Sequence, residues 1–382
     1  MYSQGVRYIF PGRRGAFREA SQKTVDTREQ DDISPPDWFT APEWVERLLN
    51  WYTKAKRPLP WRRQPEPYRI WVSEVMLQQT RVETALPHYQ RFLEAFPRLE
   101  DLAAAPEEEV LRLWSGLGYY QRARRLHQAA RLVYERYKSE PPREYEIFSR
   151  LPGVGPYTAG AVLSIAYGLP VPAVDGNVRR VYSRLLGLAE SLPPGHWTRL
   201  ARLPFSGGPA AGRPGDFNQA LMELGALVCR PAAPRCGECP LQSLCATGIG
   251  SWVPSTTSAR SKRSEPVHWV VFLVRRDGKY LMHRRPPEAL LGGLWDFPIR
   301  EGCDRPEGPV RLSDSPADLI LRPTGRLGTV RHAITFRRLH LHVLPSELSS
   351  PAPAPWTWVH PLDEDLPRSS YVDKVVRLAE KG

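Results

Sequence analysis

Long apolar runs are absent from this chain. None approaches the roughly 18–20 residues that a membrane-spanning helix needs, and the N-terminus lacks the apolar core of a signal peptide. Cysteine is scarce too, because five cysteines in 382 residues do not make the disulfide framework of a secreted protein. Four of the five fall within 17 positions, which is typical of an intracellular metal site. We therefore expect a cytoplasmic protein that makes no use of a membrane.

Acidic residues are too few to balance the basic ones. The chain has 53 Lys and Arg residues against 41 Asp and Glu, a net charge of +12. Such an excess suits a polyanionic partner such as nucleic acid, and it is explained equally well by solubility alone. The charge by itself leaves both explanations open.

Strand patterns are missing from the first two thirds of the chain. Residues 1–38 show no periodicity and read as a disordered leader, whereas residues 39–250 carry successive helical patterns broken at Pro or Gly. A polar, basic segment at 251–266 fits a linker. Short β-rich runs follow, so we expect residues 267–382 to form a separate α+β domain.

The clustered cysteines have the spacing C-x6-C-x2-C-x5-C, at Cys229, Cys236, Cys239 and Cys245. Four thiolates in one loop can hold structural zinc or an iron–sulfur cluster. Zinc folds usually present two separated C-x2-C pairs, so a single pair flanked by longer gaps favours the iron–sulfur cluster. Cys303 stands apart and is read as an incidental thiol.

The segment LPGVGP, residues 151–156, predicts a tight turn between two helices. Pro156 suits the first position of a helix. Gly153 and Gly155 would leave backbone N–H groups facing outward at that helix start, a geometry that binds phosphate without reading sequence. A plain turn between packed helices is the alternative.

Two acidic residues are candidates for catalysis. Glu74 lies in the apolar helical stretch IWVSEVML, where burial would keep a carboxyl protonated near neutral pH, as a general acid requires. An ion-paired or capping Glu is the alternative. Asp175 precedes a helix in AVDGNVRR, where the commonest role of an Asp is that of an N-cap.

Seven runs of sequence, in order along the chain, resemble the MutY-type adenine DNA glycosylases of the helix-hairpin-helix superfamily, which includes endonuclease III. The match covers about residues 40–250 and is weaker beyond. The runs are PLPWR (58–62), WVSEVMLQQT (71–80), LWSGLGYYQRAR (113–124), LPGVGPYTAGAVLS (151–164), VDGNVRRV (174–181), FNQALMELGALVC (217–229) and the four-cysteine loop.

The resemblance implies a multidomain fold. Its parts are an all-α helix-hairpin-helix glycosylase core with a [4Fe–4S] cluster loop, and a C-terminal α+β domain of the MutT (Nudix) type. The core would consist of a six-helix barrel facing the cluster domain, with the active site in the cleft between them.

The resemblance also implies the chemistry. Adenine opposite 8-oxoguanine or G would be flipped out of duplex DNA. Glu74 would protonate N7 of the base, Asp175 would stabilise the cationic sugar, and Asn177 would orient Asp175 or the water. Tyr157 stands where lyase relatives carry a lysine, and a phenol cannot form their Schiff base. We therefore expect base release without strand cleavage.

Further DNA contacts follow from the resemblance by motif. The adenine pocket would be lined by Trp61, Arg62 and Gln219. The duplex would be wedged by Gln79 and Tyr119, with Leu77 and Gln78 near the same strand. Core packing is the alternative for Trp61 and Tyr119, and a plain exposed position is the alternative for Gln78. Contact with phosphates or a solvated helix face remains open for Arg122, Arg124 and Arg125.

The C-terminal third departs from a working Nudix hydrolase. After RRPPEALLGGLWDFP (284–298) the chain lacks the Arg-Glu-x-x-Glu-Glu helix that holds Mg²⁺, so we expect recognition and not hydrolysis. In the segment that resembles the lesion-sensing loop of the family, typically Phe-Ser-His, Thr335 takes the place of Ser and Phe336 that of His. A shifted alignment would put Arg337 or His340 in that role.

The sequence thus predicts a monomeric, monofunctional adenine glycosylase of base excision repair, associated with the nucleoid of a bacterial cytoplasm through its DNA substrate. An endonuclease III-like glycosylase and lyase for oxidised pyrimidines is the alternative, which a lysine at position 157 would favour. A non-catalytic iron–sulfur DNA-binding protein would be expected to lack Glu74 or Asp175. A nucleotide hydrolase is disfavoured by the missing acidic helix.

Overall fold

The computed structural model of the chain describes residues 35–206, 208–248, 265–286, 289–302, 306, 308–312, 318–334, 337–363 and 365–381. Most of the predicted leader and linker lies outside the described residues, as do Cys303, Thr335 and Phe336. At the end of the predicted leader, Asp37–Phe39 forms a short 3-10 helix, and the side chain of Phe39 is fully buried.

The described part of the chain before residue 249 contains helices and no strands, as the sequence predicts. Many of these helices begin at a proline, whose fixed φ and missing N–H suit the first helical position. The helices are α1 (Pro42–Ala55), α2 (Pro60–Arg63), α3 (Pro67–Leu77), α4 (Val82–Ala95), α5 (Leu99–Ala104), α6 (Glu107–Trp114), α7 (Gln121–Tyr137), α8 (Tyr145–Phe148), α9 (Pro156–Tyr167), α10 (Gly176–Leu186), α11 (Pro194–Arg202) and α12 (Pro214–Leu227).

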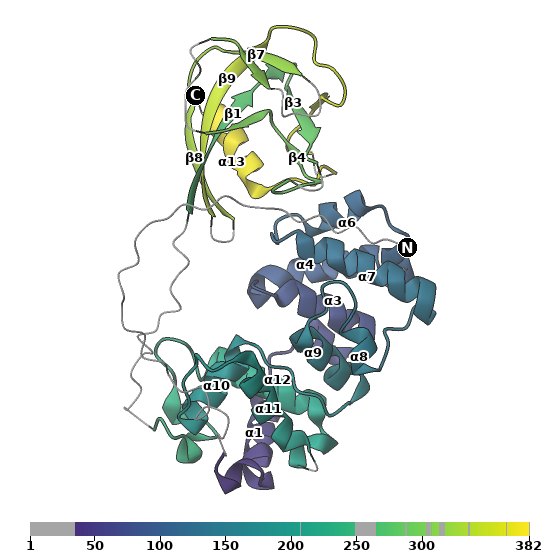
Figure 1. The fold of residues 1–382 in the computed structure, drawn as a ribbon, viewed down its shortest axis with the longest axis vertical. Coiled ribbons are helices and arrows are strands. Elements are labelled where there is room, and N and C mark those ends of the chain that lie inside the picture. The colour runs from purple at the N-terminus through teal and green to yellow at the C-terminus, as the bar shows by residue number, and fades with distance from the viewer. Residues whose placement is uncertain are drawn as a thin grey trace, which may run out of the picture. The chain divides into compact units, whose positions relative to one another are not determined.

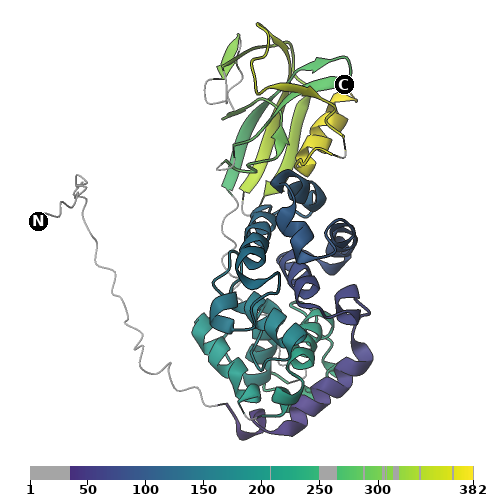
Figure 2. The ribbon, with the colours of Figure 1, turned by 90° about the vertical axis from the view of Figure 1, so that its right-hand side faces the viewer.

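These helices build two hydrophobic cores. The first helical core gathers apolar side chains of α2 to α9. The second combines α1 with α10, α11, α12 and the cysteine loop. Helix α1 lies beside α12 although the two come from opposite ends of the helical region (Figure 1, Figure 2). Because α9 of the first core packs on α12 of the second, Tyr157 at the start of α9 meets Met222 of α12 at the boundary. This arrangement confirms the expected all-α glycosylase architecture.

The C-terminal part is an α+β domain, as predicted. Its larger sheet has the strand order β5-β1-β9-β7-β6, with β8 also paired to β9, and β1 runs parallel to β9. A smaller sheet has the order β10-β3-β2, with β4 paired to β3. The strands are β1 (Glu265–Leu273), β2 (Arg275–Arg276), β3 (Lys279–Arg284), β4 (Trp295–Asp296), β5 (Ile299–Glu301), β6 (Val310–Leu312), β7 (Leu319–Pro323), β8 (Gly328–Ile334), β9 (Arg337–Leu348) and β10 (Thr357–Val359).

One helix, α13 (Ser370–Ala379), covers a face of the larger sheet (Figure 1). Its buried side chains, among them Tyr371 and Val375, pack against Trp269 and Leu341 from β1 and β9. After Pro298 the chain forms β5, which is a strand and not the acidic helix of a Nudix hydrolase. Among the described residues, no helix has the length and apolarity needed to cross a membrane.

Candidate active site

Glu74 lies inside the apolar helix α3 and is only 5% exposed. Most of the residues around it in α3 are hydrophobic and buried, so the packing of the helix takes the carboxyl out of water. Burial raises the pKa of Glu74 to about 7, against the lowering effect of a hydrogen bond from Tyr157. Glu74 is therefore protonated in a large fraction of molecules at neutral pH.

Tyr157 comes from the first turn of α9 and points at Glu74. Its hydroxyl donates a hydrogen bond of 2.6 Å to Oε2 of Glu74 and lies 3.3 Å from the sulfur of Met222. Burial, together with the charge of Glu74, raises the pKa of the Tyr157 phenol well above its usual value. Tyr157 thus stays neutral and remains a donor to the carboxyl.

Asp175 is the N-cap of α10, as its sequence context suggests. Its Oδ1 accepts a hydrogen bond of 2.7 Å from the backbone N–H of Val178, and its Oδ2 accepts one of 2.8 Å from Asn177 Nδ2. Burial raises the pKa of Asp175, whereas both hydrogen bonds favour the ionised form. The capping role and a catalytic role are compatible, since capping holds the carboxylate in one orientation.

Asn177 is held in turn by Arg180, a residue that the sequence analysis did not single out. Arg180 Nη2 donates to Asn177 Oδ1 at 2.7 Å and to the carbonyl of Gly225 at 2.8 Å, and Arg180 Nε donates to the carbonyl of Cys229 at 2.8 Å. A side chain at Gly225 would place its Cβ 2.6 Å from that of Asn177. The cysteine loop and α12 thereby support the side chain that orients Asp175.

The two carboxyl groups share a cavity at the boundary between the helical cores. This cavity of about 370 Å³ is lined by Glu74, Tyr157, Asp175 and Asn177, among others. A larger, open groove of about 870 Å³ adjoins it. The groove is lined by Leu77, Gln78, Gln79, Arg125, Gly153, Val154, Gly155, Pro156, Tyr157, Thr158, Asp175, Gly176, Asn177 and Arg179. The structure thus brings the glycine turn and the expected DNA contacts Leu77, Gln78 and Gln79 close to the two carboxyls.

The two glycines of the turn differ in backbone conformation and in the space around them. Gly153 has φ of +75°, a conformation that favours glycine, and a Cβ there would meet Arg125 at 2.8 Å. Gly155 has an ordinary extended backbone, and no atom lies within 4 Å of the place where its Cβ would stand. Gly155 therefore leaves the start of α9 open to the groove.

Two family models match this chain. Residues 72–202 match the HhH-GPD superfamily of base excision DNA repair proteins, and residues 270–377 match the NUDIX domain. Adenine DNA glycosylase of Rattus norvegicus is 37% identical over 374 residues, which are 81% of this chain and 71% of that protein. The enzyme of Schizosaccharomyces pombe is 38% identical over 337 residues, or 72% of this chain and 73% of its own length. The chain belongs to the adenine DNA glycosylase family.

This family member differs in length from some relatives. Adenine DNA glycosylase of Mus musculus is 40% identical over 310 residues, which are 66% of this chain and 59% of the mouse protein. The chain therefore spans about three fifths of that relative. Among solved structures it is similar to a thermostable thymine-DNA glycosylase, with a TM-score of 0.48 and 31% identity, over 53% of this chain and 94% of that one.

The cavity of Glu74 and Asp175 also contains a buried carboxylate, Glu223, which the sequence analysis did not single out. Glu223 accepts hydrogen bonds from Arg57 at 2.8 Å and from Arg62 at 3.0 Å. Burial opposes ionisation, but these bonds outweigh it and hold the pKa of Glu223 at about 2. Arg62 Nε also donates to Gln219 at 3.1 Å. Glu223 follows Gln219 by four residues on α12, a spacing that places both on one helix face.

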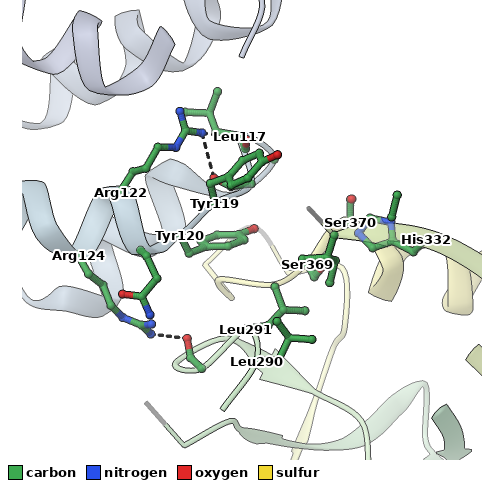
Figure 3. A pocket seen from close by; sticks show the side chains of 16 residues that line it. Leu117, Tyr119, Tyr120, Arg122, Arg124, Leu290, Leu291, His332, Ser369 and Ser370 are labelled. Carbon is green, nitrogen blue, oxygen red and sulfur yellow. Dashed lines mark hydrogen bonds between the residues drawn. The ribbon is translucent and has the colours of Figure 1, made fainter. Parts of the chain in front are cut away.

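Trp61 and Tyr119, the two aromatic residues expected to contact DNA, lie in different surroundings. Trp61 is buried, with its ring 5.0 Å from that of Tyr89, so it belongs to the core and also lines the cavity. Tyr119 is 39% exposed. It lines a further cavity of about 560 Å³ with His332 and Ser369 (Figure 3).

Arg337 and His340, the two residues that a shifted alignment would put in the lesion-sensing role, lie at different places in the β8–β9 hairpin. Ile334, directly before Thr335, lines the cavity of Tyr119. Arg337 pairs with Ile334 across the hairpin, close to its tip. His340 lies further along β9, and its ring stacks on that of His268 at 4.8 Å. His340 therefore belongs to the sheet face, away from the tip.

The three arginines in the first two turns of α7 have separate roles. Arg122 is turned inward and donates to backbone carbonyls, so neither phosphate contact nor a solvated face describes it. Arg124 bonds to Glu107 and to the carbonyl of Gly292 (Figure 3). Of the three, Arg125 lines the open groove.

The four cysteines line one small cavity in the loop that follows α12. Arg184 Nη1 donates to the sulfur of Cys229 at 3.4 Å, and the Cys245 thiol donates to the carbonyl of Arg184 at 3.3 Å. Within the described part of the chain, no group of three or more His, Cys, Asp or Glu side chains is arranged to hold a metal ion. Four sulfur donors around one cavity are nonetheless the donor set that an iron–sulfur cluster takes.

Proposed function

We propose that this chain is a monofunctional glycosylase that hydrolyses the N-glycosidic bond of adenine opposite 8-oxoguanine or G in duplex DNA. The observation that carries this proposal is the group formed by Glu74, Tyr157 and Asp175 in one cavity. It combines a carboxyl poised to be an acid with a second carboxyl held by donors that favour its ionised form. The same pairing of roles operates in retaining glycosidases.

The adenine would leave the base stack before reaction, because its glycosidic bond is inaccessible inside the duplex. The cavity that Glu74 and Asp175 line also has a group that suits the edge of the adenine base. The amide nitrogen of Gln219 can donate to a ring nitrogen of the base, whereas the Glu223 carboxylate is already occupied by Arg57 and Arg62. Gly153 and Gly155 would hold a phosphate by backbone N–H groups at the mouth of the groove.

Bond breaking would follow from the two carboxyls. Glu74 gives its proton to N7 of adenine, so the base leaves from C1′ as a neutral molecule. Asp175 stabilises the positive charge that develops on the sugar. Water then adds at C1′ and gives its proton to the Glu74 carboxylate, which restores the acid. Asn177 keeps the Asp175 carboxylate in place through its 2.8 Å hydrogen bond.

A lyase reaction would need an amine at C1′, and this site offers none. Tyr157 occupies the position where lyase relatives carry a lysine. None of the described residues that line the cavity of Glu74 and Asp175 or the open groove beside it is a lysine. This supports base release to an abasic site and disfavours the endonuclease III-like alternative.

The substrate test uses four duplexes, with A opposite 8-oxoguanine, A opposite G, A opposite T, and thymine glycol opposite A. We expect strand breaks in the first two duplexes, and only after alkali has cleaved the abasic product. Breaks without alkali, or reaction of the thymine glycol duplex alone, would contradict the proposal. The A·T duplex serves as the control for unspecific release.

We also propose that Cys229, Cys236, Cys239 and Cys245 hold a [4Fe–4S] cluster. The cluster would supply a rigid cross-link for the loop whose Cys229 carbonyl accepts from Arg180. We expect the purified chain to contain iron and acid-labile sulfide in equal amounts, and Cys239→Ser to lower both and the melting temperature. Stoichiometric zinc without sulfide would contradict this assignment.

The C-terminal domain is proposed to recognise 8-oxoguanine and not to hydrolyse nucleotides. Support comes from the cavity of Tyr119, where imidazole and hydroxyl groups of His332, Ser369 and Ser370 are within reach of a base (Figure 3). The roles of Thr335 and Phe336, the monomeric state and action on nucleoid DNA in a bacterial cytoplasm stay predictions.

A further inference from the structure

Arg122, at the start of α7, directs its guanidinium to acceptors in the last turn of α3 and in two loops, the second of which is drawn in Figure 3. The first loop joins α3 to α4, and the second joins α6 to α7. The acceptors are the carbonyls of Val75 (3.0 Å), Met76 (2.9 Å), Gln78, Leu117 (3.3 Å) and Gly118 (3.2 Å), and the hydroxyl of Thr80 (3.1 Å). The guanidinium carbon also lies 5.5 Å from the ring centre of Trp114 and 5.3 Å from that of Tyr119.

Each loop carries one residue other than glycine whose φ is positive. Gln79 has φ of 58° and Tyr119 has φ of 51°. These are left-handed conformations that cost energy for any residue other than glycine, because Cβ then approaches the backbone. Neither loop would be expected to keep this shape without outside support.

One side chain supports both loops at once, and within the second loop Trp114 Nε1 also donates to the carbonyl of Gly118 at 3.2 Å. Nη1 of Arg122 donates to the carbonyl directly before Gln79, and Nη2 donates to the carbonyl directly before Tyr119. The two peptide groups that orient Gln79 and Tyr119 are therefore tied to the two ends of one planar fork. A guanidinium can bridge two loops in this way, whereas a lysine ammonium offers one point of attachment.

We propose that Arg122 is a positioning residue that sets the spacing and orientation of Gln79 and Tyr119, and through them controls how the target base is extruded from the duplex. The inference rests on the proposed function, in which Gln79 and Tyr119 wedge the helix. Gln79 lines the open groove beside the catalytic cavity and Tyr119 is exposed, so both side chains are available to enter DNA.

A merely structural role would give a different pattern of defects. Loss of folded protein would lower activity on every substrate alike. Misplaced wedges would impair only the extrusion step and leave the acid chemistry of Glu74 intact. A substrate whose adenine is already unstacked, opposite an abasic analogue, should then hide the defect.

The test uses Arg122→Met, which keeps an unbranched stem like the aliphatic part of arginine and removes the fork, and Arg122→Lys, which keeps the charge. Arg131→Met is the matched control, because Arg131 lies on the same helix and also donates to a carbonyl, that of Ala103 at 3.1 Å. Four quantities are measured for each protein. They are the melting temperature, the fluorescence of a duplex with 2-aminopurine opposite 8-oxoguanine, and single-turnover excision from A opposite 8-oxoguanine and from A opposite the abasic analogue.

We expect Arg122→Met to lose the fluorescence rise that reports extrusion, and to excise adenine opposite 8-oxoguanine about 100-fold more slowly. The loss of excision rate that Arg122→Met shows on the unstacked substrate should be at least about tenfold smaller. The excision rate of Arg122→Lys should lie between those of Arg122→Met and wild type. A pH–rate profile is measured as well, and the midpoint for Arg122→Met should match that of wild type. Arg131→Met should behave as wild type in all assays.

Equal losses on both substrates, or an unchanged fluorescence rise, would overturn the role of Arg122. So would a defect that only follows the lost fraction of folded protein. Inactivity of the wild type on A opposite 8-oxoguanine would instead overturn the proposed function, and the fluorescence comparison would still decide the role of Arg122.

Discussion

The Glu74→Gln variant is expected to bind a duplex with A opposite 8-oxoguanine as tightly as wild type, and to release adenine about 10³-fold more slowly. The amide keeps the shape of the carboxyl and its hydrogen bond from Tyr157, but it has no acidic proton to give to the base. Binding is measured with a non-cleavable duplex and excision by single-turnover kinetics. Full activity of Glu74→Gln would remove Glu74 from its proposed role.

The same residue predicts how the rate depends on pH. Because the acid form of Glu74 is the reactive one and its pKa is about 7, the rate should fall as pH rises through 7, by about tenfold per unit above it. Asp175 must be ionised, so a second decline is expected on the acidic side. A rate that stays constant from neutral to alkaline pH would contradict a general acid with this pKa.

Tyr157→Phe tests the electrostatics of this pair. The Tyr157 hydroxyl lowers the pKa of Glu74 by donating to its carboxylate, so removing the hydroxyl should shift the alkaline limb to higher pH. Tyr167→Phe is the control, since Tyr167 lies on the same helix and donates to the carbonyl of Pro141. A pH profile that shifts in both variants, or in neither, would argue against the proposed coupling.

Asp175→Asn is expected to keep the fold and to lose about 10³-fold in excision rate. Asparagine is as good an N-cap as aspartate, and its oxygen can still accept from Val178. The amide is neutral, however, so it cannot stabilise a cationic sugar. Its amino group would also face the amino group of Asn177, so the present 2.8 Å hydrogen bond would be lost.

The measurements for Asp175→Asn are the melting temperature and the single-turnover rate. Asp216→Asn is the matched control, because Asp216 also stands near a helix start but pairs with Arg213 at the surface. We expect the control to keep wild-type excision, since exposed ion pairs contribute little. A variant at position 175 that excises adenine at the wild-type rate would exclude a catalytic role for the carboxylate.

Several features of the site could be read from local sequence because neighbouring residues determine them. The apolar run around Glu74 dictates that the helix is buried, and burial is the largest cause of the raised pKa of its carboxyl. Asp175 stands directly before a helix and is its N-cap. Gly153 needs a positive φ that its turn imposes. Each of these properties depends on a few adjacent residues.

Partners that come from distant segments could not be read in this way. Glu223 meets Arg57 and Arg62 only because α12 packs beside the segment that precedes α3. Arg180 reaches Asn177, Gly225 and Cys229 only after α10 and α12 have packed closely. An arginine in a helical sequence reads as a surface residue, so nothing local distinguishes Arg122 from Arg131.

The sequence by itself therefore determined the helical and α+β parts, the spacing of the cysteines, the two carboxyls and the phenol in place of an amine. These follow from periodicity, residue chemistry and the resemblance of ordered motifs. Only the tertiary structure decided that Tyr157 donates to Glu74, that Glu223 holds Arg62, and that one guanidinium supports both Gln79 and Tyr119. Such contacts join residues far apart along the chain, and the packing of whole helices, which no single segment encodes, sets their distances.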